Sequence, residues 1–293
     1  MKATLHTVVP WWAKIAIKMA LARLPIPMRA WHRFGLFVPG FMRDPGYAID
    51  VFESHWRRAG SPAPGFTYLE LGPGESLATA LVAWAYGARG GALVDAGNFA
   101  VRDLAHDRPL IARLAQKPCP RDVRELSELS SLDAVLMKVG AEVRTDGLAG
   151  LKTLPSDSVD LLFSQAVLEH VPLAEFAATM AELHRIQKPG GVGSHRVDFK
   201  DHLQGSLNNL RFSEATWEQP WFAQRSGFYT NRLRFSVMRD AFTRAGFSVT
   251  VQERNHWDAL PIKRNKISAS FRNLPDDELR TSGAVFVLTK DRR

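Results

Sequence analysis

The stretch YLELGPGESLATALV, from Tyr68 to Val82, passes from a strand-like run through a glycine turn into a strongly helical run. A glycine turn between a strand and a helix lets a ligand approach the backbone closely. It also points the amide groups at the start of the helix toward that ligand. The stretch therefore predicts a strand–turn–helix unit that holds a ligand at its turn.

Strand and helix patterns alternate along the rest of the chain. Strands are expected over residues 67–72, 91–97, 141–145, 158–165, 192–199, 247–254 and 283–290. Helices are expected over 47–60, 75–87, 173–187 and 232–246, with a polar helical stretch over 100–140. The run 158–165 is almost continuously apolar, as in strands of buried parallel sheets. This alternation predicts a doubly wound α/β sheet with ligands at the carboxyl ends of its strands.

The chain is expected to divide into four parts. Residues 1–60 form a basic, tryptophan-rich helical extension that ends at the proline-rich linker SPAPG. Residues 61–200 form the ligand-binding core, and 201–235 form a lid inserted after the fifth strand. Residues 236–293 supply the last helix and the final two strands of the core.

Two acidic residues beside the glycine turn narrow the choice of ligand. The third glycine of the dinucleotide fingerprint is replaced by Leu77. Asp95 ends the second expected strand. A carboxylate there accepts hydrogen bonds from both ribose hydroxyls of NAD or of S-adenosylmethionine (SAM). Glu70 lies two residues before Gly72, and a carboxylate there suits the ammonium and sulfonium charges of SAM better than a pyrophosphate. The pattern favours SAM.

Four ordered motifs carry a family resemblance: LELGPGES, LVDAG, LPSDSVDLLFSQAVLEHV and ELHRIQKPGG. Over residues 65–290 the chain resembles class I SAM-dependent methyltransferases of the type-11-like branch, which implies a seven-stranded Rossmann-like sheet and SAM as cofactor. The resemblance implies these cofactor contacts: Glu70, Gly72 and Gly74 at the methionine end, Ser76 in place of a frequent glycine, Asp95 at the ribose, Asp146 and Gly147 at the adenine, and Gln165 at the methyl-transfer site.

A second group of polar residues follows the fifth strand, in SHRVDFKDH. His195, Asp198 and His202 would share one face of a helix, whereas in a strand His195 and Asp198 would point to opposite sides. One hypothesis is a His/Asp general base acting on a hydroxyl acceptor, with His170 as a further candidate base. A divalent metal held by His and Asp is a less favoured hypothesis, and a structural role is the third.

The expected lid combines aromatic rings with amide and guanidinium groups. Its aromatic residues are Trp217, Trp221 and Tyr229, and its polar residues include Asn208, Asn209, Arg211, Asn231 and Arg232. Such a set suits a sugar ring or a phosphorylated small molecule, or else packs the lid internally. The phrases SHRVDFKDH, NNLRFSE and FYTNRLRFS resemble methyltransferase-domain proteins of bacterial surface-polysaccharide pathways. That resemblance implies a hydroxyl of a glycan, sugar nucleotide or lipid-linked sugar as acceptor.

Three other readings compete with the carbohydrate acceptor. The first is a SAM-dependent methyltransferase of a lipid or quinone-like small molecule, and the second is a non-catalytic SAM-binding protein. RNA binding, the third, is disfavoured because no aromatic RNA-binding motif is present and the charge of residues 61–293 is nearly balanced.

The first 43 residues contain seven basic and no acidic residues, and four of the eight tryptophans lie in the first 60. Such an arm predicts either peripheral contact with an anionic membrane or a helical lid packed on the core. Cys119 is the single cysteine, which fits a reducing compartment and a cytoplasmic protein. No apolar run is long enough to predict a membrane-spanning helix.

Overall fold

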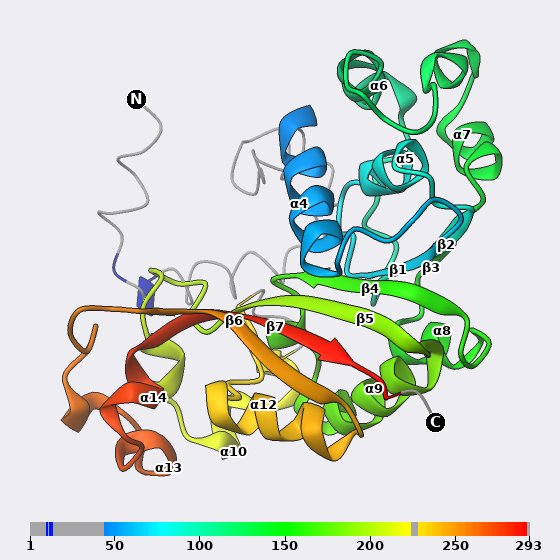
Figure 1. Ribbon diagram of the computed structural model, residues 1–293. Coiled ribbons are helices and arrows are strands. Elements are labelled where there is room, and N and C mark those ends of the chain that lie inside the picture. Colours follow the sequence, from blue (N-terminus) through cyan, green and yellow to red (C-terminus); the bar gives the residue numbers. More distant parts are fainter. Residues whose placement is uncertain (1–9, 11, 14–43, 224–227, 292–293) are drawn as a thin grey trace.

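The computed structural model describes residues 10, 12–13, 44–223 and 228–291. Seven strands form one sheet in the order β3-β2-β1-β4-β5-β7-β6 (Figure 1). Strands β1 to β5 pair in parallel, and β7 runs antiparallel to both β5 and β6. The strands are β1 Thr67–Leu71, β2 Gly90–Val94, β3 Ala141–Arg144, β4 Val159–Gln165, β5 Gln187–Asp198, β6 Ser248–His256 and β7 Thr281–Thr289. This order confirms the predicted seven-stranded Rossmann-like sheet.

Helices cover both faces of the sheet. The longer ones are α4 Pro45–Arg58, α5 Ala78–Ala85, α6 Arg108–Leu114, α7 Leu132–Lys138, α8 Gly147–Lys152, α9 Leu173–Ile186 and α12 Phe235–Arg244. The shorter ones are α10 Glu214–Trp217, α11 Pro220–Ala223, α13 Ala269–Arg272 and α14 Asp276–Arg280, with single 3-10 turns such as η1 Leu104–His106, η3 Leu168–His170 and η4 Asn208–Arg211. Helices α4 to α7 lie on one face, and α8, α9 and α12 on the other (Figure 1).

Each face of the sheet has its own apolar core because side chains alternate along a strand. Tyr68 and Phe163 point into the core under α4 and α5. Leu69 and Leu162 point into the core under α9 and α12. Strands β1 and β4 are therefore apolar on both sides, which agrees with the buried run expected at 158–165.

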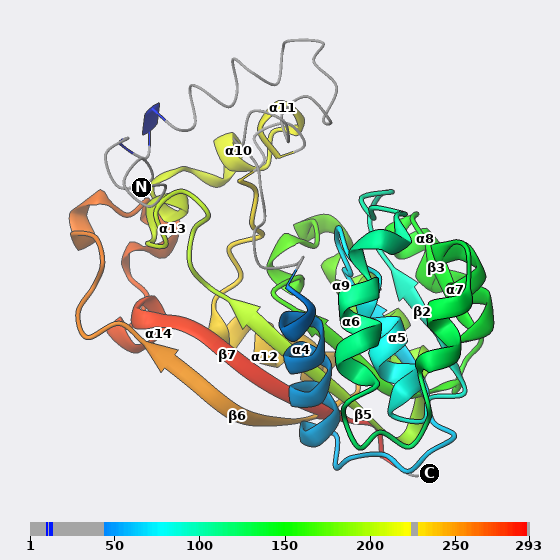
Figure 2. The ribbon, with the colours of Figure 1, turned by 90° about the horizontal axis from the view of Figure 1, so that it is seen from above.

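Helix α4 begins with a cap and lies over the sheet (Figure 2). The Asp44 side chain accepts a hydrogen bond from the Gly46 amide at 2.8 Å, and Pro45 occupies the first turn. The Phe52 ring meets the Phe163 ring edge-on, with 5.9 Å between centroids. The end of the expected extension thus shares a core with the sheet, while the boundaries at 60, 200 and 235 stay predictions.

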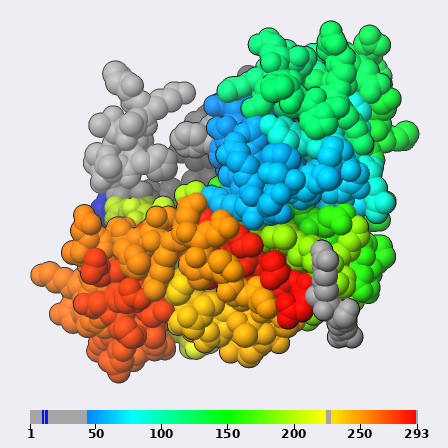
Figure 3. Space-filling model, in the orientation of Figure 1, coloured from blue at the N-terminus to red at the C-terminus, as the bar shows by residue number. Residues whose placement is uncertain are grey.

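Three segments differ from the expected pattern. The polar helical stretch 100–140 contains the two short helices α6 and α7, with 3-10 turns and irregular segments around them. Strand β5 begins at Gln187, directly after α9, so Pro189 lies within the strand. Residues 257–280 were not predicted as a helical insertion, yet they hold α13 and α14 and lie with β6 at the end of the molecule opposite α6 and α7 (Figure 3).

The predicted membrane contact of residues 1–43 lies outside the described residues. Within the described ranges, no helix has the length and apolar character that crossing a bilayer requires.

Candidate active site

The carboxyl ends of β1 and β4 lie side by side in the middle of the sheet, where the strand order reverses. Ligands of open α/β sheets bind in the crevice outside such a point. Gly72 follows β1 with φ +73°, and Ala166 follows β4 with φ +54°. A Cβ on Gly72 would lie 2.4 Å from the nearest Val167 methyl group, so only glycine fits. Gly72 is therefore required by its packing against Val167, and Gly72 and Gly74, both at positive φ, leave the turn without side chains at two positions where a ligand can approach the backbone.

Asp95 lies beside the glycine turn, as the ribose expectation requires. One carboxylate oxygen accepts a hydrogen bond from the Gly74 amide at 2.8 Å, and the other accepts one from the Ala96 amide at 2.7 Å. Burial raises the pKa of Asp95, and these amides oppose the rise. The structure thus brings together Gly72, Gly74 and Asp95.

Asp146 and Gly147 lie at the next strand end. The Gly147 amide donates to the Asp95 carbonyl at 2.8 Å, and Gly147 has φ +52°. The expected adenine contacts therefore lie next to the expected ribose acid. Sequence reasoning missed Phe99, whose side chain is 54% exposed in the same loop. An exposed ring four residues after Asp95 offers a flat face for a base, and that spacing is the signal that could have pointed to it.

Glu70 points away from the crevice and toward α5. Its carboxylate is buried and accepts a hydrogen bond from the Thr79 hydroxyl. Burial raises the pKa of Glu70 to about 8, with the charge of Asp95 adding to the rise. In this structure Glu70 ties β1 to α5, and its contact with the methionine end of SAM stays a prediction.

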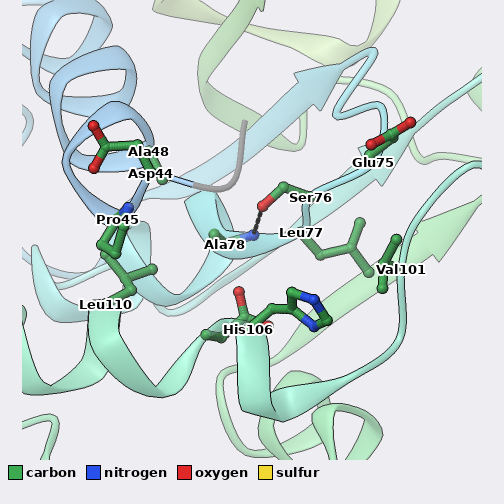
Figure 4. Close-up of a pocket in the computed structure, with 11 residues that line it drawn as sticks. Asp44, Pro45, Ala48, Glu75, Ser76, Leu77, Ala78, Val101, His106 and Leu110 are labelled. Atoms are coloured by element: carbon green, nitrogen blue, oxygen red, sulfur yellow. Dashed lines mark hydrogen bonds between the residues drawn. The ribbon is translucent and has the colours of Figure 1, made fainter. Parts of the chain in front are cut away.

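Ser76 lies on the far side of the turn, beside a small cavity (Figure 4). Its hydroxyl accepts a hydrogen bond from the Ala78 amide at 3.3 Å, at the start of α5. The cavity measures about 30 Å³, and Asp44, Pro45, His106 and Leu110 also line it. That volume suits a water molecule or two rather than a cofactor. The cavity marks where α4 and α6 meet the turn.

Gln165 ends β4 and is held by a residue that sequence reasoning missed. His55, on the buried face of α4, bonds to the Gln165 amide oxygen at 3.1 Å and to the Ser194 hydroxyl at 2.7 Å. Burial lowers the pKa of His55 to about 3, and the charge of Arg58 acts in the same direction. The neutral ring therefore donates from Nε2 to Gln165 and accepts at Nδ1 from Ser194. In the sequence His55 stands on an otherwise apolar helix face, and nothing in that pattern indicates its hydrogen bonds to Gln165 and Ser194.

His195 lies within β5 and not at its end. The ring is fully buried, packs against Phe242 and bonds through Nδ1 to the Ser164 hydroxyl at 2.8 Å. Burial lowers the pKa of His195 to about 3. Because β5 stays extended through Asp198, His195 and Asp198 point to opposite faces, as the strand alternative predicted. The structure does not bring His195 together with the other candidate bases.

His170 and His202 do meet, beyond the carboxyl ends of β4 and β5, and the charge of Asp198 acts on His170. The two histidine rings stack with 4.7 Å between centroids. Glu169 joins them: its carboxylate accepts from the Asp198 amide at 3.3 Å, and burial raises its pKa to about 8. Sequence reasoning missed Glu169 although it stands in the motif LEHV. The edge of the sheet thus carries a polar cluster beside the glycine turn.

The polar lid residues form hydrogen bonds within the lid and to the turn after β4. Asn231 donates to the Leu168 and Val171 carbonyls, and Asn209 donates to the Thr230 hydroxyl. Further inside, the Trp217 indole donates to the Thr230 carbonyl, and Arg232 lies over the Trp217 ring while donating to the Phe212 carbonyl. These contacts fit the internal-packing alternative for the lid.

Residues 123–193 match the family model of a methyltransferase domain. No curated protein matches the chain.

Several solved structures resemble it at 12–13% identity. They include the YcgJ protein from Bacillus subtilis (12% identity, 85% of this chain and 100% of that chain, TM-score 0.46). A Haemonchus contortus phosphoethanolamine N-methyltransferase 2 in complex with SAM shows 13% identity over 83% of this chain and 53% of that chain, with TM-score 0.46. A Burkholderia thailandensis 1,6-didemethyltoxoflavin-N1-methyltransferase shows 13% identity over 97% and 92%, with TM-score 0.44.

The domain match and the sheet order together bear out the predicted enzyme class. The chain is a methyltransferase with SAM as its methyl donor.

Proposed function

We propose that this chain methylates a hydroxyl oxygen of a carbohydrate-type acceptor: a glycan, a sugar nucleotide or a lipid-linked sugar. The observation that carries the proposal is the polar cluster of Glu169, His170, Asp198 and His202 beside the glycine turn. A hydroxyl must lose its proton as its oxygen gains a methyl group, and an imidazole positioned at this edge can accept that proton. A purely apolar edge would suit a lipid or quinone-like acceptor instead.

The cofactor side of the proposal rests on the residues around the glycine turn. When bound, SAM supplies a methyl group activated by its sulfonium charge. Gly72 and Gly74, both at positive φ, put no side chain between their backbone and a ligand, which supports close approach of this cofactor. Asp95 would hold the ribose, Asp146 and Gly147 the adenine, and Gln165 would face the transferred methyl group. His55 keeps Gln165 in place for that role.

His170 and His202 are the better-placed candidate bases, because both side chains are exposed at this edge whereas His195 is buried. A base must reach the proton that it removes. We therefore assign proton removal to the pair His170 and His202, with Asp198 and Glu169 nearby, and a supporting role to His195. The lid over residues 201–235 would close over the acceptor from the same side.

Incubation with isotopically labelled SAM and a panel of cell-envelope glycan precursors tests the proposal, with mass spectrometry reading which compound gains one methyl group. A quinone, a phospholipid and RNA complete the panel. Methylation of a glycan hydroxyl supports the proposal, whereas exclusive labelling of one of the other three overturns the acceptor class. Asp95→Ala serves as the control with a damaged cofactor site.

Peripheral binding of residues 1–43 to an anionic membrane belongs to the same proposal. Their charge fits an acceptor carried on a lipid pyrophosphate, in a cytoplasmic enzyme working at the membrane surface. Sedimentation with anionic vesicles, compared with neutral vesicles, tests this part by itself. Equal recovery with both vesicle types would speak against it.

A further inference from the structure

We propose that Glu169, His170 and His202 form a binding site for a divalent transition-metal cation such as Zn²⁺. The carboxylate and ring atoms that could bind a cation all lie within 4.8 Å of one another. Two imidazoles and one carboxylate are a donor set for Zn²⁺ and its neighbours, whereas Mg²⁺ and Ca²⁺ prefer oxygen ligands alone. Binding itself is independent of the proposed acceptor. A bound cation would occupy the imidazole lone pairs that otherwise take the proton, and would instead lower the pKa of an acceptor hydroxyl at an open position. Only that catalytic role rests on the proposed function.

Glu169 supplies an oxygen that lacks a partner. The residue is 3% exposed, and its Oε1 accepts the Asp198 amide at 3.3 Å. Its Oε2 is buried and has no hydrogen-bond partner among the residues that the structure describes. A buried carboxylate oxygen left unpaired is destabilising. A cation at the cluster would satisfy it.

His170 is oriented as a metal ligand. Its Nδ1–H donates to the Tyr229 carbonyl at 3.0 Å, which fixes the tautomer and leaves the Nε2 lone pair to coordinate. A backbone carbonyl on the second ring nitrogen is the usual partner of a metal-binding histidine. The His202 ring lies over the His170 ring, 4.7 Å away and inclined by 27°. One ring nitrogen of each histidine lies within 4.8 Å of the other and of a Glu169 carboxylate oxygen.

Hydrogen bonds from lid residues hold the backbone that carries the cluster. The Asn231 amide donates to the Glu169 carbonyl at 2.7 Å. Asp201, next to His202, accepts hydrogen bonds from the Leu203 and Asn208 amides at 3.0 and 2.6 Å. Ligands held on such a framework need little ordering when a metal binds. Because the His170 and His202 side chains are exposed, a cation there keeps open positions for water or an acceptor oxygen.

Calorimetric titration of ZnCl₂ into the full-length protein tests the site. For this titration the protein is prepared without a histidine tag, is stripped of metal with EDTA and is free of SAM. We expect one tight equivalent of Zn²⁺ and no comparable heat from MgCl₂. His202→Ala and Glu169→Gln should each weaken Zn²⁺ binding by at least about tenfold. His256→Ala is the matched control, because His256 is an exposed histidine on β6 paired with Asp277, and it should bind Zn²⁺ like the unmodified chain.

SAM titration of every variant shows whether it is folded, and His202→Ala keeps the test decisive if the buried Glu169 tolerates no change. Unchanged Zn²⁺ affinity in a folded His202→Ala variant overturns the site, and so does the absence of a tight equivalent in the unmodified chain. Preference for Mg²⁺ overturns the cation class. Zn²⁺ binding without methylation of any glycan would leave this site standing while the proposed acceptor fails.

Discussion

Val167 occupies the space that a side chain at Gly72 would need. Two of its methyl carbons lie 2.4 and 2.5 Å from the position of a Cβ built on Gly72. The contact joins the turn after β1 to the turn after β4, which are the two loops at the switch point of the sheet. The shape of the cofactor turn therefore depends on a residue almost one hundred positions away in the sequence.

Gly72→Ala should destabilise the fold by about 3 kcal/mol, because it adds a steric clash to a strained left-handed backbone. Urea denaturation measures the loss. Gly205→Ala is the matched control: Gly205 has φ +66°, but no atom lies within 4 Å of the place that a Cβ would take there. It should lose only the backbone part, about 1 kcal/mol. Equal losses of unfolding free energy in the two variants would show that the Val167 side chain moves aside at no measurable cost.

Asp95→Ala should weaken SAM binding by at least about tenfold, because the ribose loses its acceptor and the Gly74 amide loses its partner. Isothermal calorimetry measures it. Asp95→Asn separates the two causes, since the amide oxygen can still accept from Gly74. A change below about twofold in the alanine variant would mean that the ribose acid lies elsewhere.

The stability of the protein should fall as the pH drops below 6.5, and His55 should account for part of the loss. Burial lowers the pKa of His55 from 6.5 to about 3. Between these values the unfolded chain binds a proton that the folded chain does not, so the contribution is complete above pH 6.5 and is lost on acidification. His55→Gln keeps hydrogen-bonding capacity but cannot titrate. From pH 6.5 to pH 5 it should lose about 2 kcal/mol less than the unmodified chain, as measured by urea unfolding at each pH. Equal losses of unfolding free energy in the variant and in the unmodified chain would show that His55 does not contribute to the pH dependence.

His195→Ala and His202→Ala should separate stability from turnover. His195 is fully buried against Phe242, so its removal should cost about 3 kcal/mol of unfolding free energy. His202→Ala should leave the melting temperature nearly unchanged and reduce turnover by about a hundredfold at unchanged SAM affinity. A folded His195→Ala variant with lost turnover, beside a fully active His202→Ala variant, would reverse the two assignments.

Several elements could be predicted from local pattern alone. The apolar run 158–165, the glycine turn at Gly72 and the alternation of strands and helices give β1, β4 and the sheet class. The α13–α14 insertion was missed because residues 257–280 lack a sustained helical period. His55 and Glu169 were missed because a histidine on an apolar helix face and a glutamate in a turn look ordinary until their partners are known.

The sequence by itself determined the order of the elements, the position of the glycine turn and the class of ligand, because each follows from the conformational and chemical preferences of neighbouring residues. Tertiary structure alone decided which polar side chains meet. Strand β5 sends His195 into the core and Asp198 to the other side, and the short segment after β5 places the His202 ring on the His170 ring. Such encounters join residues far apart in the chain, and no local preference encodes them.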